Sequence, residues 1–594
     1  MPETPTNHPY LRILGRLLKF LVPYRWSLAV SIVLAAASQA ASIALVRVTQ
    51  SVIDDGIRAR DQRMVWILVG IGVALGLAKA LMLVGRRFIS GRQALGVEFD
   101  MRNALYAHLL RLSFGFYDRH QTGQLMSRAT VDLQGVRFFL GYGLIFFAQN
   151  LFTIVGATAI MFWTEWQLAL VAVAITPALI WLAYRYSSVS HPVLRDVQQK
   201  MADVATVAEE NIVGVHVVKA FAQEEREIDK FGRRSEAVFQ RTIDANRQRS
   251  LYVPILSFIP LLAQAAILLV GGWMVVHDRL TVGEFFAFNL YVSMLIMPLR
   301  MLGMWIGQSQ RATASGERIF QVLDEPEDIS DRPEAVDLPS GEGLIEFEGV
   351  TFGYDPERPV LERVDLAIAP GTNVAIIGHT GSGKTTLTAL VPRFYDVTAG
   401  RLLVDGADVR DVKLTSLRRA IAVISQDPFL FSTSVRENIA FGAPDATDEE
   451  IEHAARLAQA HEFIAELPEG YETVIGERGI TLSGGQRQRV AIARAIVTNP
   501  RILILDDATA SVDATTEAKI RLGLRQAMEG RTTLIIAHRL STISLADEIV
   551  VLDHGRIAAR GTQGELAETS PVYREIYEHG LIEQEFISRL EATA

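Results

Sequence analysis

The sequence predicts an α-helical membrane domain followed by an α/β domain with a largely parallel sheet. Long apolar segments and all seven tryptophans lie within the first 305 residues, whereas the remainder alternates short apolar runs with helical patterns. The chain of 594 residues is 49% hydrophobic and 21% charged, and its mean hydropathy is +0.21. This composition excludes both an ordinary soluble enzyme and a protein embedded wholly in lipid.

Charge is divided unequally along the chain. Residues 1–320 hold 32 Lys and Arg against 22 Asp and Glu, and the remainder holds 26 against 45. The basic first part suits an anionic lipid surface, and the acidic second part excludes nucleic acid as a partner. The chain has no cysteine. Disulfides, thiolate metal sites, a cysteine nucleophile and S-palmitoylation are therefore excluded.

Six apolar segments are each long enough to cross about 30 Å of hydrocarbon as a helix. They are residues 27–46, 64–85, 138–163, 166–184, 252–276 and 282–302. The connections 86–137 and 185–250 carry eight and eleven basic residues. We therefore expect a multi-pass protein of the cell (inner) membrane, with both connections and both termini in the cytoplasm. Apolar residues at helical spacing before the first span predict a short helix on the inner leaflet.

Composition also predicts the domain boundaries. We expect the membrane domain at residues 1–320 and the α/β domain, with a C-terminal helical tail, at residues 344–594. Residues 321–343 between them contain eight acids, one arginine and three prolines. A segment with so few apolar groups cannot bury much surface, which makes it the predicted linker.

A glycine-rich loop in the α/β domain fits a phosphate-binding pattern. Residues 378–385 (GHTGSGKT) match G-x-x-x-x-G-K-[ST] between an apolar strand and a helical run. Backbone N–H groups of such a loop surround phosphate oxygens, Lys384 reaches the outer phosphates, and Thr385 can hold Mg²⁺. The candidate nucleotide ligands here are Gly378, Thr380, Gly381, Ser382, Gly383, Lys384, Thr385 and Thr386. The sequence therefore predicts an α/β domain of the P-loop NTPase type.

Two further segments are expected beside the nucleotide. The apolar strand 501–505 ends in Asp506-Asp507, which places Asp506 at the carboxyl edge of the sheet as a Mg²⁺ partner. Solvated surface charge is the alternative for paired acids at a strand end. Residues 482–486 (LSGGQ) precede a helical stretch, with Ser483 as the N-cap and two glycines that allow an anion to approach. A plain capped helix explains Ser483 and one glycine but not the whole pentapeptide.

These motifs, in this order, resemble an ATP-binding cassette. The matching segments are Tyr354, GHTGSGKT, Gln426 in SQDPFLF, Glu477-Arg478-Gly479, LSGGQ, ILILDD, SVD and His538 in IIAHR. With six preceding spans, the chain resembles a half-transporter of the ABC exporter type, similar to bacterial multidrug and lipid exporters. Two segments of the membrane domain, 116–123 (FYDRHQTG) and 217–224 (VVKAFAQE), resemble the coupling helices that dock on nucleotide-binding domains. Phe116, Tyr117 and Phe221 are the candidate coupling residues within them.

The resemblance implies ATP and Mg²⁺ as cofactors and assigns a role to each motif residue. Tyr354 stacks on adenine, Gln426 contacts Mg²⁺ and water, and His538 reaches the γ-phosphate. Ser483, Gly485 and Gln486 would contact ATP held by the other subunit. Asp513 would link the two sites, and Glu477 is a further candidate coupling residue. ATP that contacts both halves only when they are closed favours the closed state. Taken singly, Tyr354 or His538 would more often be a packing or surface residue.

Asp507 departs from the family pattern, in which a glutamate orients or deprotonates the attacking water. Aspartate is one methylene shorter, and a displacement of about 1 Å can lower a rate about a hundredfold. We therefore expect this chain's own site to bind ATP well and to hydrolyse it slowly. We favour a heterodimer with a second half-transporter, whose competent site the intact LSGGQ completes. The alternative is a homodimer in which Asp507, helped by His538 and Gln426, still turns over slowly.

Polar residues inside the spans mark a candidate transport path, because lipid tails disfavour them. They are Lys79, Gln149, Asn150, Gln264 and Asn289, together with Gln39. Lys79 either snorkels to the interface, which we favour, or contacts an acidic substrate.

The predicted activity is ATP-driven export, or flipping between leaflets, of amphipathic or hydrophobic small molecules, lipids or peptides. Membrane lipid and one such molecule are the expected partners besides the second subunit. Two alternatives are an importer on the same architecture, as for some iron-chelate carriers, and a regulatory or nucleotide-gated subunit that moves no substrate.

Overall fold

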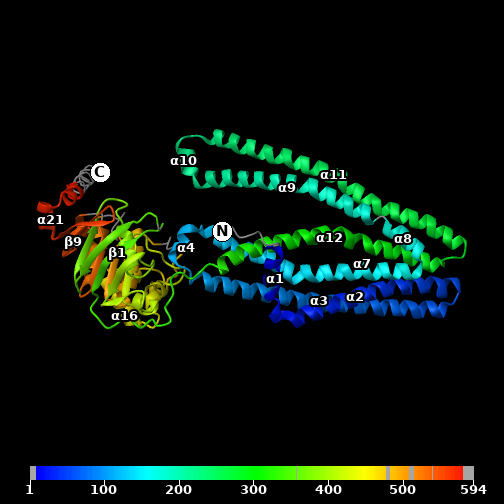
Figure 1. Cartoon of the computed structure of the whole chain (residues 1–594), viewed down its shortest axis with the longest axis horizontal. Coiled ribbons are helices and arrows are strands. Elements are labelled where there is room, and N and C mark those ends of the chain that lie inside the picture. Colours follow the sequence, from blue (N-terminus) through cyan, green and yellow to red (C-terminus); the bar gives the residue numbers. More distant parts are fainter. Residues whose placement is uncertain are drawn as a thin grey trace. The chain divides into compact units, whose positions relative to one another are not determined.

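The protein forms two compact units (Figure 1). The structure is a computed structural model that describes residues 9–174, 176–355, 357–476, 482–506, 514–537 and 540–578. The first unit, Met1–Leu110 with Thr122–Glu325, is helical in its described residues. The second unit, Arg111–Gln121 with Pro326–Ala594, holds both sheets.

Helices of very different lengths build the first unit. They are α1 (Pro9–Lys19), η1 (Val22–Tyr24), α2 (Arg25–Ser51), η2 (Val52–Arg58), α3 (Gln62–Leu109), α5 (Thr122–Ser127), η3 (Arg128–Asp132), α6 (Leu133–Phe138), η4 (Phe139–Gly143), α7 (Leu144–Thr164), α8 (Trp166–Ala174), α9 (Thr176–Val213), α10 (Val215–Ala220), α11 (Glu224–Val276) and α12 (Val282–Leu323). The 48 residues of α3 extend over about 72 Å at 1.5 Å per residue, more than twice the thickness of the hydrocarbon core. The predicted second span and residues 86–109 of the connection that follows it therefore form one continuous helix.

Within the described chain, five helical segments are long and apolar enough to cross a membrane. They are Val22–Arg58, Gln62–Leu109, Thr122–Thr164, Glu224–Val276 and Val282–Leu323. The sequence predicted six. The fourth predicted span, 166–184, is divided between α8 and α9, and residue 175 between them lies outside the described residues.

The predicted N-terminal helix is present as α1, and it packs on α12. The Leu17 side chain is fully buried, and the guanidinium of Arg16 forms an ion pair of 2.6 Å with Asp324 and lies 3.8 Å from the ring centroid of Phe320. A Cβ atom on Gly316 would lie 2.9 Å from a methyl carbon of Leu17. The helix is thus fixed to α12 by both apolar and charged contacts.

The second unit contains a six-stranded sheet in the order β10-β9-β3-β8-β7-β6 and a four-stranded antiparallel sheet in the order β2-β1-β4-β5. The strands are β1 (Ile345–Phe352), β2 (Leu361–Ile368), β3 (Asn373–Ile377), β4 (Ala399–Val404), β5 (Ala407–Asp408), β6 (Ile421–Ile424), β7 (Ile502–Asp506), β8 (Thr532–Ile536), β9 (Glu548–Asp553) and β10 (Arg556–Gly561). Strands β9, β3, β8, β7 and β6 run parallel, as the alternation of apolar runs and helices predicted.

Both faces of the six-stranded sheet are covered. In β3, Val374 and Ile376 pack in a core shared with the antiparallel sheet, whereas Ala375 and Ile377 pack in a second core with helices on the other face. A strand buried on both faces reads as a continuous apolar run rather than an alternating one. The helices of this unit are α4 (Phe114–Arg119), α13 (Lys384–Leu390), α14 (Leu414–Arg419), α15 (Val435–Ile439), η5 (Ala440–Gly442), α16 (Asp448–Leu457), α17 (His461–Ala465), η6 (Gly470–Glu472), α18 (Gly484–Val497), α19 (Ala514–Met528), α20 (Leu540–Ile543) and α21 (Gln563–Thr569).

The acidic segment after α12 is held against the second unit. Val336 exchanges backbone hydrogen bonds with the chain before α14, donating to the Asp411 carbonyl (3.1 Å) and accepting from the Lys413 N–H (2.8 Å). Arg332 pairs with Asp411, and Asp331 accepts a hydrogen bond of 2.7 Å from the Leu414 N–H. The part of the segment that follows residue 330 is therefore attached through its backbone and charges, although it buries little apolar surface.

Candidate functional site

The candidate site lies where four parallel strands end. The glycine-rich loop follows β3, and Asp506 ends β7. One residue, Ser425, separates Gln426 from the end of β6. These strands and β8 are neighbours with a common direction, so their carboxyl ends share one edge of the sheet. His538 follows β8 in the sequence but lies outside the described residues.

The glycine-rich loop is closely packed against the strands behind it. A Cβ atom on Gly378 would lie 2.1 Å from the Leu552 carbonyl oxygen, so no other residue fits there without a shift of β9. Gly383 has φ +101°, in the left-handed region, and a Cβ there would lie 2.8 Å from a methyl carbon of Leu361. Both positions therefore require glycine.

Lys384 closes the loop upon itself. Its side chain is 6% exposed, and Nζ donates hydrogen bonds to the carbonyl oxygens of Gly378 (2.8 Å) and His379 (3.0 Å). Burial lowers the pKa of Lys384, and the carboxylate of Asp506 acts in the opposite direction without cancelling that shift. A buried cation beside a ring of backbone amides is an arrangement that favours an anion with several oxygens.

An unpaired polar atom lies in the same loop. The Ser382 hydroxyl is buried and has no hydrogen-bond partner among the described residues. Buried polar atoms are otherwise nearly always satisfied. Thr385, by contrast, is exposed, and the hydroxyl of the buried Thr386 lies 3.1 Å from the Tyr354 hydroxyl. The loop thus fits a nucleotide phosphate, whose oxygens would supply the partner that Ser382 lacks.

Tyr354 provides an aromatic surface beside the loop. The residue is 55% exposed. Its ring meets Phe352 and Tyr395 edge to face, with centroids 5.2 and 5.3 Å away. Two aromatic neighbours and the contact with Thr386 fix the ring while most of it remains open to a base.

The LSGGQ segment begins α18 as predicted. Ser483 is the N-cap, its hydroxyl accepts from the Gln486 N–H (3.2 Å), and its own N–H donates to the Gln486 side-chain oxygen (2.8 Å). The Gln486 side chain is therefore engaged in a capping box. Ser483 and Gly484 are exposed and Gly485 is buried. The start of α18 thus presents a serine hydroxyl and glycine backbone at the surface.

Several predicted site residues cannot be placed. Glu477, Asp507, Asp513 and His538 lie outside the described residues, so their roles remain predictions. Gln426 is described and exposed.

The first predicted coupling segment packs with the second unit through α4 (Figure 1). The Phe114 ring lies 4.4 Å from that of Phe394, and the Tyr395 hydroxyl donates a hydrogen bond of 2.7 Å to Asp118. The sequence predicts Phe116 and Tyr117 as the coupling residues instead. Phe116 is 2% exposed and stacks on His120 within the same segment, and Tyr117 meets Phe116 edge to face. Phe114 precedes the first coupling segment, and the periodicity of the sequence does not indicate its role.

The second predicted coupling segment begins on α10, which joins α9 to α11 at one end of that helix pair (Figure 1). Phe221 is 71% exposed, Val217 62% and Val213 79%. These three form an apolar surface that no other described part of the first unit covers.

The structure brings two pairs of intramembrane polar residues together. Gln264 donates to the Asn289 side-chain oxygen at 3.0 Å, which links α11 to α12. Gln149 accepts a hydrogen bond from Arg86, a buried arginine that also lies 5.1 Å from the Phe146 ring. Arg86 is not among the residues predicted from the sequence, because it follows the predicted end of the second span by one residue. Gln39, Lys79 and Asn150 are half-buried.

Two family models match the chain. One is described as an ABC transporter transmembrane region and matches residues 28–299, and the other is described as ABC transporter and matches residues 361–510. They cover the helical and the α/β part respectively.

Relatives of known sequence match nearly the whole chain. An uncharacterised ABC transporter ATP-binding protein of Bacillus subtilis is 38% identical over 569 residues, which cover 95% of this chain and 96% of that protein. An ATP-dependent lipid A-core flippase of Syntrophus aciditrophicus is 37% identical, over 97% of this chain and 96% of the flippase. A multidrug efflux ATP-binding/permease protein of Mycobacterium tuberculosis is 38% identical over 94% of this chain, which spans 47% of that protein.

A solved structure also matches. The structure of a bacterial Atm1-family ABC exporter with ATP bound is similar with a TM-score of 0.78 and 30% identity, over 93% of this chain and 98% of the exporter chain.

Proposed function

The chain belongs to the ABC transporter family, as a half-transporter of the exporter type, and from this premise we propose that it exports or flips lipids or amphipathic drug-like molecules across the cell membrane as one half of a dimer. The predicted fold class is confirmed: a helical exporter-type membrane domain joined to an α/β P-loop domain. The ATP hydrolysis of this family is coupled to transport, so the chain is a transporter ATPase.

The observation that carries the proposal is the unsatisfied Ser382 hydroxyl beside the buried Lys384. In the proposed complex the 378–386 loop holds the phosphates of ATP, and Tyr354 stacks on the base. Mg²⁺, held by Thr385, Asp506 and Gln426, would neutralise the charge on the outer phosphates. The described residues contribute binding and orientation: Lys384 moves from the loop carbonyls to the phosphate oxygens, and its positive charge remains at the site throughout.

Two exposed surfaces support a second subunit. Ser483 and Gly484 lie uncovered at the start of α18, where they would meet the γ-phosphate of ATP bound to the partner. A groove of about 830 Å³ between α14, β6 and α18 is lined in part by Phe429, Phe431 and Phe441. The apolar surface on α10 suits such a groove on a partner subunit. Dimer closure would bury both surfaces, and ATP favours closure because it contacts both halves only then.

We further propose that the hydrolytic site of this chain is the slow one. Asp507 stands where the family has glutamate, and its shorter side chain holds the attacking water less well. A partner half-transporter with glutamate would then carry the faster site, completed by the Ser483 segment of this chain. A homodimer with two slow sites is the alternative.

The substrate proposal rests on the relatives and on the membrane helices. One relative is named a lipid A-core flippase and another a multidrug efflux protein. In this chain the Gln264–Asn289 and Arg86–Gln149 pairs place polar groups between apolar helices. Such groups would contact the polar part of an amphipathic molecule while the surrounding side chains contact its apolar part. We place the ATP-binding domain and both termini in the cytoplasm.

The test is reconstitution of the purified chain in liposomes that contain a fluorescent phosphatidylethanolamine. We expect ATP to redistribute the labelled lipid between leaflets, or to drive accumulation of the dye Hoechst 33342 in vesicles whose ATP-binding domains face outward. The Lys384→Ala variant is the inactive control. ATP hydrolysis without movement of either probe, with and without a co-expressed partner half-transporter, would contradict the export proposal.

A further inference from the structure

A short loop in the second unit contacts both the candidate base site and α4. The loop comprises residues 392–396 and follows α13. On one side, the Tyr395 ring meets the Tyr354 ring edge to face at 5.3 Å. On the other side, the Tyr395 hydroxyl donates to the Asp118 carboxylate at 2.7 Å, and Phe394 lies 4.4 Å from Phe114. One side chain therefore touches the aromatic platform and the docked helix at once.

We propose that Tyr395 is a positioning residue that links base stacking on Tyr354 to the placement of α4, through its ring on one side and its hydroxyl on the other. This inference rests on the proposed function, because it needs a base on Tyr354. It adds to that function a specific route by which the base, as distinct from the phosphates, affects the segment that joins α3 to α5.

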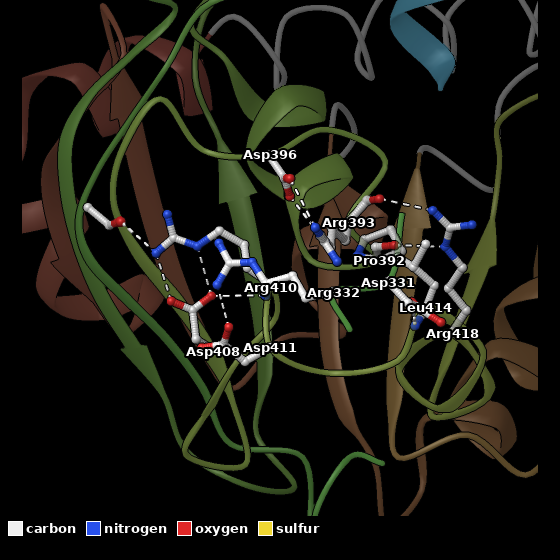
Figure 2. Close-up of polar contacts among 11 residues, drawn as sticks. Asp331, Arg332, Pro392, Arg393, Asp396, Asp408, Arg410, Asp411, Leu414 and Arg418 are labelled. Carbon is white, nitrogen blue, oxygen red and sulfur yellow. Dashed lines mark hydrogen bonds and ion pairs between the residues drawn. The ribbon is translucent and has the colours of Figure 1, made fainter. Parts of the chain in front are cut away.

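Polar contacts of Pro392, Arg393 and Asp396 fix the backbone of the loop on both sides of Tyr395 (Figure 2). The buried Arg393 guanidinium makes two hydrogen bonds to Asp396, of 2.7 and 3.1 Å. Arg418 of α14 donates to the carbonyl oxygens of Pro392 (3.1 Å) and Arg393 (2.9 Å). Paired contacts of this kind set geometry as well as energy.

Contacts at both ends of α14 fix the helix that carries Arg418. The helix starts at Leu414, whose N–H donates to Asp331 in the segment after α12 (Figure 2). At its other end the Arg418 guanidinium lies 5.6 Å from the Phe394 ring centroid, next to the ring that Phe114 contacts. The contacts with Arg418 and Asp396 thus fix the loop backbone from which the Phe394 and Tyr395 side chains reach α4.

The Tyr395 hydroxyl acts as a donor over the whole physiological range. Burial, the hydrogen bond to Asp118 and the charge of that carboxylate raise the pKa of Tyr395 well above its usual value. The proton therefore remains on the tyrosine. A hydrogen bond from a neutral hydroxyl to a carboxylate is charge-assisted and directional, so a shift of the ring on Tyr354 would alter the position of Asp118.

Hydrogen–deuterium exchange on the full-length chain in lipid nanodiscs tests this inference. The probes are the ATP analogue AMP-PNP, which has a base, and inorganic tripolyphosphate, which has none. In the wild type we expect both probes to slow amide exchange in residues 378–386, and AMP-PNP alone to slow exchange in α4, by about threefold or more. If both probes protect α4 equally, the base has no part in the link and the inference is overturned.

Three variants separate the hydroxyl from the ring. Tyr395→Phe keeps the ring against Tyr354 and removes the hydrogen bond, and Asp118→Asn weakens the same bond from the other side. With AMP-PNP, both should retain protection of residues 378–386 and lose protection of α4, and the double variant should be no worse than either single variant. Tyr471→Phe is the matched control, because its hydroxyl contacts His461 at 3.0 Å, away from α4.

The outcomes distinguish the inference from the proposed function. If AMP-PNP fails to protect residues 378–386 in the wild type, the nucleotide site itself is wrong. If that loop is protected and Tyr395→Phe protects α4 as well as the wild type does, only the role of Tyr395 is wrong. A merely structural role for Tyr395 would change the exchange of α4 to the same extent with and without AMP-PNP, which also contradicts the inference.

Discussion

The carboxylate of Asp506 acts to raise the pKa of Lys384 against the lowering effect of burial, although the two residues are 122 positions apart in the sequence. The parallel arrangement of β3, β8 and β7 accounts for this, because it brings the end of β7 to the edge from which the glycine-rich loop emerges. The cation that we propose for the phosphates and the anion that we propose for Mg²⁺ thus lie at one edge of the sheet.

Lys384→Ala should abolish most ATP hydrolysis, by about a hundredfold or more, because it removes the buried charge that would stabilise the outer phosphates. The measurement is phosphate release by the purified chain, with binding of fluorescent mant-ATP as a second readout. Lys413→Ala is the control, since Lys413 is a half-buried lysine outside the glycine-rich loop that pairs with Asp337. Loss of activity in both variants to the same extent would contradict the assignment.

ATP affinity should fall at alkaline pH. Burial lowers the pKa of Lys384 in the free protein, so the lysine begins to lose its proton below the pH at which an ordinary lysine does, about 10.4. As the pH rises through the lowered pKa, binding must first restore that proton and therefore weakens. Titration with mant-ATP between pH 7 and 10 measures the effect. A Lys384→Arg variant stays charged and should show a flat profile, so an equally steep decline there would exclude Lys384 as the cause.

Ser483→Ala should lower both stability and activity. Loss of an N-cap hydroxyl costs about 1 kcal/mol, and the same change removes the group proposed to contact the partner's ATP. Thr447→Ala is a matched control, because Thr447 caps α16 in the same type of capping box. We expect similar losses of thermal stability for the two variants and a loss of ATPase activity for Ser483→Ala alone. Equal activities would reduce the role of Ser483 to capping.

Asp507→Glu should raise ATP hydrolysis by the chain purified alone, by about tenfold or more, because the added methylene restores the reach to the attacking water. Asp507→Asn should lower the residual rate. Phosphate release at saturating ATP is the measurement, with mant-ATP binding expected to be unchanged. A wild-type rate that neither variant alters would contradict the slow-site proposal.

The Gln264–Asn289 pair should show coupled substitutions. Gln264→Leu leaves the Asn289 amide without its partner between apolar helices and should destabilise the chain by about 1 kcal/mol. The double replacement, with Asn289→Leu, should be less harmful than the sum of the singles, because no polar group remains unpaired. Thermal unfolding in detergent measures stability, and movement of labelled lipid in liposomes measures transport. Normal transport by the double variant would remove both residues from the transport path.

Periodicity and motif spacing predict the secondary structure around the motifs. The strand that precedes Gly378, the N-cap at Ser483 and the parallel arrangement of apolar runs follow from local chemistry. A phosphate loop is defined by glycines close in sequence, and this made Lys384 predictable from a window of eight residues.

Contacts between distant segments were not predictable. Phe114 and Tyr395 are separated by 281 positions in the sequence, and nothing in either neighbourhood indicates the other. Arg86 was missed because a charged residue ends an apolar run, although the side chain is buried and bonded to Gln149. The acids and prolines of the segment after α12 predict a linker that buries little surface, whereas its attachment to residues 411–414 depends on backbone hydrogen bonds, which composition does not encode.

Because α3 is long, a small rotation about one end produces a large displacement of the other end. Since the helix is about 72 Å long and has no internal proline, it can act as a rigid lever. A tilt of about 5° around one end would sweep the other end through about 6 Å, roughly one helical turn. A rotation of only a few degrees at one end of α3 therefore displaces its other end by about the width of a small molecule.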